Sequence, residues 1–340
     1  MSSRHSPQLG LFAGEYTRTA REQGVFESRA RELSACEPIA QTLDPRVRMG
    51  TSSWSFSGWA GLVYSAERSA SELAREGLRE YVEHPLLRTV GIDRGYYAAI
   101  PPADLQQYAE QTPEHFVFCT KAPEAITSPI VSKHRDPGNA GHFNEDFLNA
   151  ARFVDEMVGP FLEHLGARTG PFILEFPPLP RDSRLQPEPF AEALDDFLSA
   201  LPEGLQLAVE LRDPALMTEA YARVLTRRGC AHVYNYWSRM PSITSQLRAI
   251  SLTKQPFAVT RLLLRPGTQY QTQREKFAPF DALVEPDLTM RDEVCDVVEA
   301  ATRAGLESFV LVNNKAEGSS PRTVRAIAER LNARALRSAR

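Results

Sequence analysis

The sequence lacks the cysteine spacing that is typical of disulfide-rich or zinc-ribbon proteins. It has only four cysteines, which stand far apart and form no Cys-x-x-Cys pair: Cys36, Cys119, Cys230 and Cys295. We therefore expect reduced thiols and a cytoplasmic protein. The first residues, "MSSRHSPQLGLFAGEY", also lack the apolar stretch of a secretory signal.

Long apolar runs and a strong excess of one charge are missing as well. No run is long enough to span a bilayer, so we expect no membrane segment. The net charge of -4 offers no general basic field for nucleic acid or a membrane surface. A composition of 42% hydrophobic and 24% charged residues is typical of a globular protein with a large core.

From Arg46 onward, short β-like runs alternate with helical patterns. There are eight such runs: "VRMGTSS", "LLRTVGID", "HFVFCTK", "PFILEF", "LQLAVELR", "CAHVYNYW", "FAVTRLLL" and "SFVLVNN". The alternation indicates parallel strands covered by helices, and eight strands close a (β/α)8 barrel. A doubly wound open sheet is the alternative, but no Gly-x-Gly-x-x-Gly turn follows the first run. We predict an α/β fold, a TIM barrel over residues 46–335 with an N-terminal extension.

The extension, residues 1–45, is polar and rich in arginine. The stretch "YTRTAREQGVFESRARELSA" has a helical pattern, so we expect an arm that is partly helical or mobile. We expect this arm to cover part of the barrel without being needed for its fold. Its apolar residues Leu11, Phe12 and Phe26 would belong to the core only if that expectation were wrong.

Five segments in order carry a resemblance to a known family. They are "GTSSWSFSGWAGLVY", "YAEQTPEHFVFCTKAPEAIT", "GPFILEFPP", "LAVELRDPAL" and "VLVNNKAEGSSPRTV". With them the chain resembles the domain of unknown function 72 family, also called YecE-like, over about Arg46 to Leu331. The resemblance implies a TIM barrel and a candidate site but no reaction, because the activity of the family is not established.

The chain departs from the pattern of that family at four positions. The resemblance implies Glu and Asn on the second strand, where this chain has Gly91 and Asp93. It implies Gln before the Phe-Pro-Pro and His on the seventh strand, where this chain has Glu175 and Leu263. These departures indicate a divergent member, in which the chemistry of the family is either altered or lost.

Side-chain parity along the strands predicts which groups face the barrel mouth. In "LQLAVELRD", Glu210 and Arg212 lie on the face opposite the apolar Leu207, Val209 and Leu211, at the C-terminal end where barrels bind substrates. We predict Glu210, Glu175 and Asp93 as catalytic residues. The same reasoning predicts substrate-binding residues at the mouth: Ser52, Lys121, Arg212, Arg261, Asn313 and Asn314.

Aromatic residues beside the first and sixth strands predict an apolar wall for a flat or ring-shaped ligand. Trp54 and Trp59 follow the first strand, and Tyr236 with Trp237 follows the sixth from across the mouth. The alternative is that both tryptophans of the first loop only plug the barrel top or pack beneath the N-terminal arm.

Three functions compete for these residues. In the first, the protein is a metal-independent acid/base enzyme, hydrolase-like, on a small polar and sugar-like substrate. Glu175 and Glu210 end neighbouring strands ~4.8 Å apart, close to the ~5–5.5 Å between the carboxyl groups of retaining glycosidases. In the second, the mouth binds a metabolite or anion without catalysis. Its three acids and three cations balance, which suits a zwitterionic or sugar-like ligand better than a multiply charged phosphate.

The third function is metal-assisted phosphoester cleavage, as in barrel endonucleases. None of the seven histidines stands at the C-terminal end of a predicted strand, so only a carboxylate magnesium site from Asp93, Glu175 and Glu210 is conceivable. We expect no structural zinc, no cofactor and no nucleic-acid partner. A small molecule is the expected ligand, and the sequence leaves the oligomeric state open.

Overall fold

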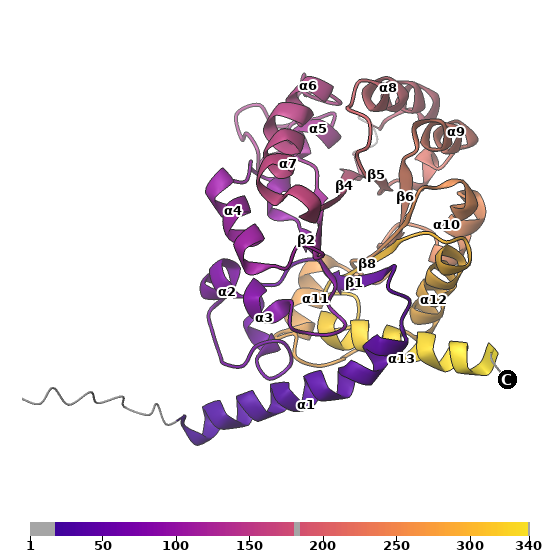
Figure 1. Ribbon diagram of the computed structural model, residues 1–340. Coiled ribbons are helices and arrows are strands. Elements are labelled where there is room, and N and C mark those ends of the chain that lie inside the picture. The colour runs from indigo at the N-terminus through magenta and orange to yellow at the C-terminus, as the bar shows by residue number, and fades with distance from the viewer. Residues whose placement is uncertain (1–17, 180–183, 339–340) are drawn as a thin grey trace, which may run out of the picture.

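Eight parallel strands close into a barrel in the order of the chain, so the predicted TIM barrel is confirmed (Figure 1). The computed structural model describes residues 18–179 and 184–338. The strands are β1 (Val47–Thr51), β2 (Thr89–Ile92), β3 (Val117–Lys121), β4 (Thr169–Phe176), β5 (Leu207–Leu211), β6 (Ala231–Tyr236), β7 (Ala258–Leu262) and β8 (Ser308–Val312). Seven of the eight predicted runs contain one of these strands, and the run "PFILEF" lies within β4.

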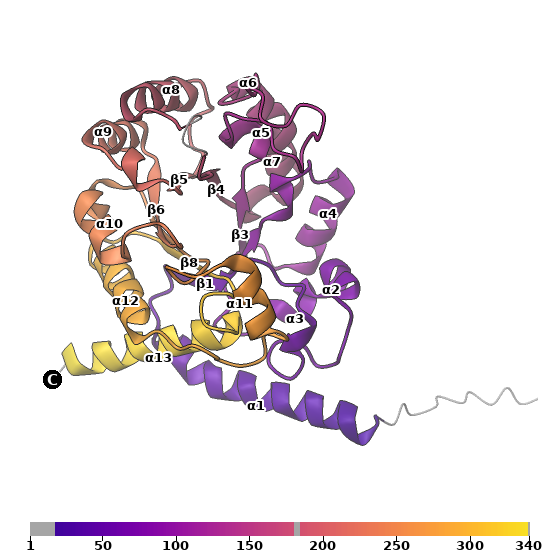
Figure 2. The ribbon, with the colours of Figure 1, turned by 180° about the vertical axis from the view of Figure 1, so that it is seen from behind.

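Helices surround the barrel on its outside (Figures 1 and 2). They are α1 (Ala20–Thr42), α2 (Ala70–Glu76), α3 (Leu78–Tyr81), α4 (Pro102–Gln111), α5 (Glu124–Thr127), α6 (Ala150–Phe153), α7 (Gly159–Leu165), α8 (Pro187–Ser199), α9 (Glu219–Arg228), α10 (Ile243–Ala249), α11 (Tyr270–Phe277), α12 (Leu288–Arg303) and α13 (Ser320–Ser338). Shorter helical turns are η1 (Ser57–Trp59), η2 (Arg94–Tyr96), η3 (Val154–Val158), η4 (Gly166–Arg168), η6 (Pro214–Leu216) and η7 (Leu252–Lys254). None of the helices in the described ranges is long and apolar enough to cross a membrane.

Local sequence explains where these helices begin and end. In α9, the Thr218 hydroxyl accepts a hydrogen bond from the Tyr221 N–H, and the helix ends at Gly229 with a left-handed φ of 60°. A side-chain acceptor at the start satisfies an N–H that has no helical partner, and glycine is the residue that adopts the left-handed end most easily.

The alternation of side chains divides the apolar core into two parts. One part fills the barrel and holds residues such as Ile173, Ala208 and Val259. The larger part lies between the strands and the helices, and Phe172 and Leu174 belong to it. Because the parity of each strand is fixed in this way, the inward positions at the C-terminal strand ends all converge on one space, the barrel mouth.

The N-terminal extension contributes a long helix that lies against the barrel. α1 starts with a capping box between Thr19 and Glu22, and it lies beside α13 (Figures 1 and 2). It buries Cys36 and Ala40, whereas Phe26 stays 37% exposed. The helical pattern of the sequence thus lies on α1, Phe26 is no core residue, and Leu11 and Phe12 lie outside the described residues.

We predict that a chain without residues 1–45 still unfolds cooperatively but at a lower temperature. The barrel keeps its two cores, while the deletion uncovers the surface on which Cys36 and Ala40 pack. Circular dichroism during heating measures this effect, with a chain that lacks only residues 1–17 as the control. A gradual transition without a clear midpoint in the shorter chain would show that α1 is part of the folding unit.

Candidate functional site

Six charged side chains meet at the barrel mouth, where parity predicts them. They come from the C-terminal ends of five strands: Asp93, Lys121, Glu175, Glu210, Arg212 and Arg261. Glu175 and Glu210 are paired in register on β4 and β5, so the two carboxylates lie side by side. We call these six residues the charge network.

Arg261 is the centre of the charge network. Its side chain is 1% exposed and crosses the barrel from β7 to reach acids on three other strands. Nη1 lies 2.6 Å from Glu210 Oε2 and 3.3 Å from Glu175 Oε2. Nη2 donates to both oxygens of Asp93, at 2.9 and 3.0 Å. One guanidinium therefore binds all three acids of the mouth.

Arg212 and Lys121 complete the network. Nη2 of Arg212 lies 2.7 Å from Glu175 Oε2 and 2.6 Å from Glu210 Oε1, and Lys121 Nζ lies 2.9 Å from Glu175 Oε1. Three acids and three cations leave no net charge, as buried charges require. Burial by itself raises the pKa of Glu175, but Arg212, Lys121 and Arg261 together hold that pKa well below its usual range.

The predicted tryptophan wall is wrong. Trp54 is only 5% exposed, its Nε1 donates to the Leu73 carbonyl at 3.0 Å, and its ring meets Tyr108 edge-on. Trp59 is fully buried against Phe56. Both rings belong to the core between barrel and helices, since strand parity no longer applies once the chain has left β1.

Tyr236 also points away from the mouth. It is the neighbour of the inward Asn235 on β6, so it faces the helices, and its hydroxyl donates to Asp287 Oδ2 at 2.7 Å. The prediction of Tyr236 as a ligand-binding residue is therefore wrong for a different reason: Tyr236 lies within the strand, where the two-residue period turns it away from the mouth.

Trp237 of the predicted wall does lie at the mouth, and three tyrosines that were not predicted join it; three of these four rings lie against a cation. The Tyr96 ring lies 3.5 Å from Lys121 Nζ, the Trp237 ring 4.1 Å from Arg212 Cζ, and the Tyr270 ring 4.4 Å from Lys315 Nζ. Tyr97 is next to Tyr96 and 68% exposed. We call Tyr96, Tyr97, Trp237 and Tyr270 the aromatic rim. The pair "YY", Tyr96 and Tyr97, three residues after Asp93 is the signal for this part of the rim in the sequence.

The remaining predicted binding residues divide between the mouth and the helix layer. Ser52 is buried on an inward position, and a Cβ on Gly91 would come within 2.9 Å of its backbone oxygen. This close approach requires glycine where the family resemblance implies glutamate. Asn313 lies at the mouth end of β8, but Asn314 accepts hydrogen bonds from the N–H and hydroxyl of Ser320 and caps α13.

Lys315 is a residue of the mouth that strand parity missed. Asn313 Oδ1 accepts the Lys315 backbone N–H at 3.1 Å and holds this turn in place. Burial lowers the pKa of the Lys315 amine to about 8, although nearby Asp93 opposes the shift. In the described ranges, no carboxylate lies within ion-pair distance of its Nζ, which faces the Tyr270 ring.

The mouth has an open edge at Asp93 and a groove beside Arg212. The side chain of Asp93 is 36% exposed, whereas those of Glu210 and Arg261 are at most 1% exposed. The groove has a volume of about 330 Å³ and is lined on its polar side by Arg184, Arg212, Asp213 and Arg239. A ligand can therefore reach the network from solvent at the Asp93 edge. The buried side chains of Glu210 and Arg261 block access from inside the barrel.

The three mouth carboxylates do not form a metal site. They surround the guanidinium of Arg261, which occupies the space that a divalent cation would need. Within the described part of the chain, one group of His, Cys, Asp or Glu side chains is close enough to hold a metal, namely Glu32, Cys36 and His84. That group lies at the other end of the barrel, so the magnesium alternative gains no support.

Fold and site together define a (β/α)8 barrel whose mouth is closed by a neutral network of buried charges. The chain belongs to the family described as "Protein of unknown function DUF72", whose model matches residues 48–340. This match confirms the resemblance stated above. It begins after α1, so the N-terminal helix lies outside the family match.

Solved structures of the same family share the fold. A DUF72 family protein from Thermotoga maritima is 22% identical, with a TM-score of 0.56 over 84% of this chain and 99% of its own. A DUF72 family protein from Enterococcus faecalis is 17% identical, with a TM-score of 0.55 over 84% of this chain and 95% of its own. None of the curated proteins matches the chain significantly. At these identities the likeness shows the fold alone.

We predict that Glu210→Gln lowers stability strongly. The carboxylate is fully buried between Arg212 and Arg261, and its loss leaves the network with one uncompensated positive charge. Breaking a buried pair costs about 3–5 kcal/mol, which thermal unfolding detects readily. The control Glu163→Gln removes an exposed acid and should change the melting temperature little. Equal melting temperatures for Glu210→Gln and wild type would mean that the mouth is solvated and the pairs are weak.

We predict that Lys315→Met stabilises the protein at neutral pH. The pKa of Lys315 falls from the usual 10.5 to about 8 on folding, so the folded state disfavours the charged amine. This penalty is present in full below pH 8 and disappears as the pH rises toward 10.5. Melting temperatures measured from pH 7 to pH 10.5 should therefore converge for the variant and wild type. A constant or growing difference would contradict the lowered pKa.

Proposed function

We propose that this protein is a metal-independent acid/base enzyme that acts on a small polar substrate at the barrel mouth, with Lys315 as the group that transfers the proton. The observation that carries this proposal is the partly buried amine of Lys315 without a carboxylate partner in the described ranges, beside Asp93 at the open edge. An amine with a pKa near the working pH is neutral in a useful fraction of molecules and can accept a proton.

The paired acids Glu175 and Glu210 serve this enzyme as fixed charges. A general acid needs a raised pKa so that it still holds a proton at neutral pH, but the surrounding cations keep the pKa of Glu175 low. The glycosidase-like role that their spacing predicts therefore finds no support in their environment. Their function in this proposal is to hold Arg212 and Arg261 rigidly in the mouth.

The rim and the groove favour a small organic anion as substrate. Among the described residues, Arg184, Arg212 and Arg239 line the groove with one acid, Asp213, so a carboxylate or phosphate group of the substrate would be attracted there. Trp237 and the exposed Tyr97 offer flat apolar faces to the remaining carbon skeleton. Hydroxy acids and sugar acids combine these two features.

Non-catalytic binding of such an anion is the second candidate. The complete pairing of the six charges favours it, because a rigid and neutral network suits recognition as well as catalysis. The two candidates differ in one property, since only the enzyme removes a proton from its ligand.

Exchange of substrate hydrogen for deuterium tests the proposed function. The protein is incubated in D₂O with a panel of hydroxy acids, keto acids and sugar acids, and proton NMR follows the loss of C–H signals. We expect exchange for at least one compound, loss of at least ~100-fold in rate for Lys315→Met, and no change for the exposed control Lys254→Met. Binding of a panel compound without exchange would overturn the enzyme in favour of the binding protein. Unchanged exchange in Lys315→Met would remove Lys315 from the proposal.

A further inference from the structure

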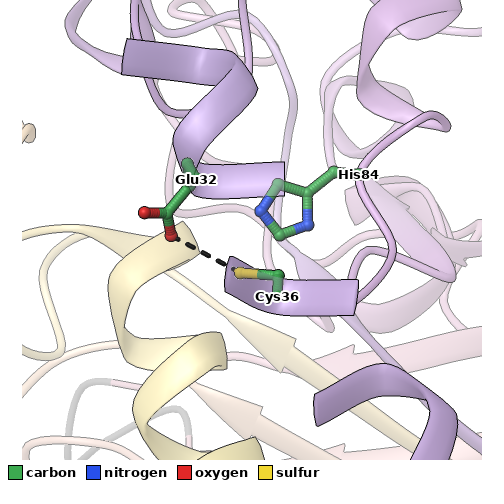
Figure 3. Close-up of side chains that lie close together, drawn as sticks. All are labelled: Glu32, Cys36 and His84. Carbon is green, nitrogen blue, oxygen red and sulfur yellow. Dashed lines mark hydrogen bonds between the residues drawn. The ribbon is translucent and has the colours of Figure 1, made fainter. Parts of the chain in front are cut away.

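A second cluster of functional side chains lies at the opposite end of the barrel, between α1 and the loop before β2. Glu32 and Cys36 are four residues apart on α1 and therefore share one helix face. His84 lies in the loop after α3, and its ring points toward both of them (Figure 3). One ligand atom from each residue lies within 4.8 Å of those from the other two.

The distance between two of the three ligand atoms already suits a tetrahedral metal ion. Cys36 Sγ is 3.5 Å from Glu32 Oε1 (Figure 3). A tetrahedral zinc with a thiolate at about 2.3 Å and a carboxylate at about 2.0 Å separates these ligands by about 3.5 Å. Cys36 and His84 are both at most 1% exposed, so such an ion would be enclosed by protein.

His84 provides an independent indication of a missing ligand. Its Nε2 is buried and has no hydrogen-bond partner, although the residue is 1% exposed. A buried polar atom without a partner is costly and needs an explanation. The neutral imidazole is the form of histidine that binds metals.

The surroundings of the cluster resemble the second shell of a metal site. Arg325 Nη1 binds Glu32 Oε2 at 2.9 Å, which orients the carboxylate so that Oε1 faces Cys36. A groove of about 620 Å³ is lined by His84 and by Ala40 of α1, and it offers an entry path from solvent.

We propose that Glu32, Cys36 and His84 bind one zinc ion that fastens α1 to the barrel. Thiolate, imidazole and carboxylate are the ligand types that zinc selects, and a water molecule fills the fourth position. The site belongs to this chain rather than to its family, because Glu32 and Cys36 precede the matched residues 48–340. It also revises the expectation of no structural zinc, which considered only the strand ends.

Binding changes the protonation of two ligands. Zinc binds cysteine as the thiolate, so the Cys36 thiol releases its proton to solvent when the Zn–S bond forms. The Leu86 N–H now contacts His84 Nδ1 at 3.3 Å, so the neutral ring carries its proton on Nε2. On binding, that proton moves to Nδ1 and this long contact opens. One proton is thus released for each zinc ion.

Metal content and metal-dependent stability test the site in the full-length, untagged protein. After removal of metal with a chelator and addition of zinc, we expect about one zinc and about one released proton per chain. The melting temperature should rise with zinc and fall with chelator. Cobalt(II) should give the near-ultraviolet band of a thiolate-to-metal transition.

Matched variants assign the metal to this cluster. Cys36→Ser and His84→Gln should lose zinc and its effect on the melting temperature, whereas Cys295→Ser, which changes another buried cysteine, should keep both. If the first two variants do not fold, the cobalt band of the wild type and its absence in Glu32→Gln decide the question. Zinc below about a tenth of an equivalent, with a melting temperature that responds to neither zinc nor chelator, would overturn the proposal. Equal loss of zinc in Cys295→Ser would overturn it too.

Discussion

The structure of the barrel mouth depends on the guanidinium of Arg261. It crosses the interior from β7 and binds acids from β2, β4 and β5 at once. Without it, only Lys121 and Arg212 would face three carboxylates, two of them buried, and the network would carry an uncompensated negative charge. The fork of an arginine, with its fixed donors, suits this arrangement better than the single ammonium of a lysine.

This constraint separates the mouth into a buried, rigid floor and an accessible edge. The floor consists of fully paired charges. The cations around Glu175 keep the carboxyl group of this residue ionised. The edge holds the groups that the network leaves accessible, Asp93 and Lys315, beneath the aromatic rim. Chemistry at neutral pH needs a group that can change its protonation, and such a group is found at the edge rather than in the floor.

The strand residues of the site could be predicted from the sequence, but the loop residues could not. A strand alternates with a period of two, so Glu210, Arg212 and Arg261 are placed at the mouth by their own neighbours in the chain. Trp54 and Trp59 lie beyond the end of β1, where no such period holds, and they turn into the helix layer. The cluster of Glu32, Cys36 and His84 depends on how α1 packs on the barrel, and this is a long-range contact without a local signal.

A double-mutant cycle on Glu210→Gln and Arg261→Met tests the account of the mouth most directly. Each single change leaves the network with one unbalanced charge, but the double variant keeps two acids and two cations and is neutral again. The account predicts that the double variant loses less stability than the sum of the single losses, by about 2–3 kcal/mol in the free energy of unfolding. A double-variant loss that equals the sum of the two single losses to within about 0.5 kcal/mol would contradict the account. The two groups would then contribute to stability independently.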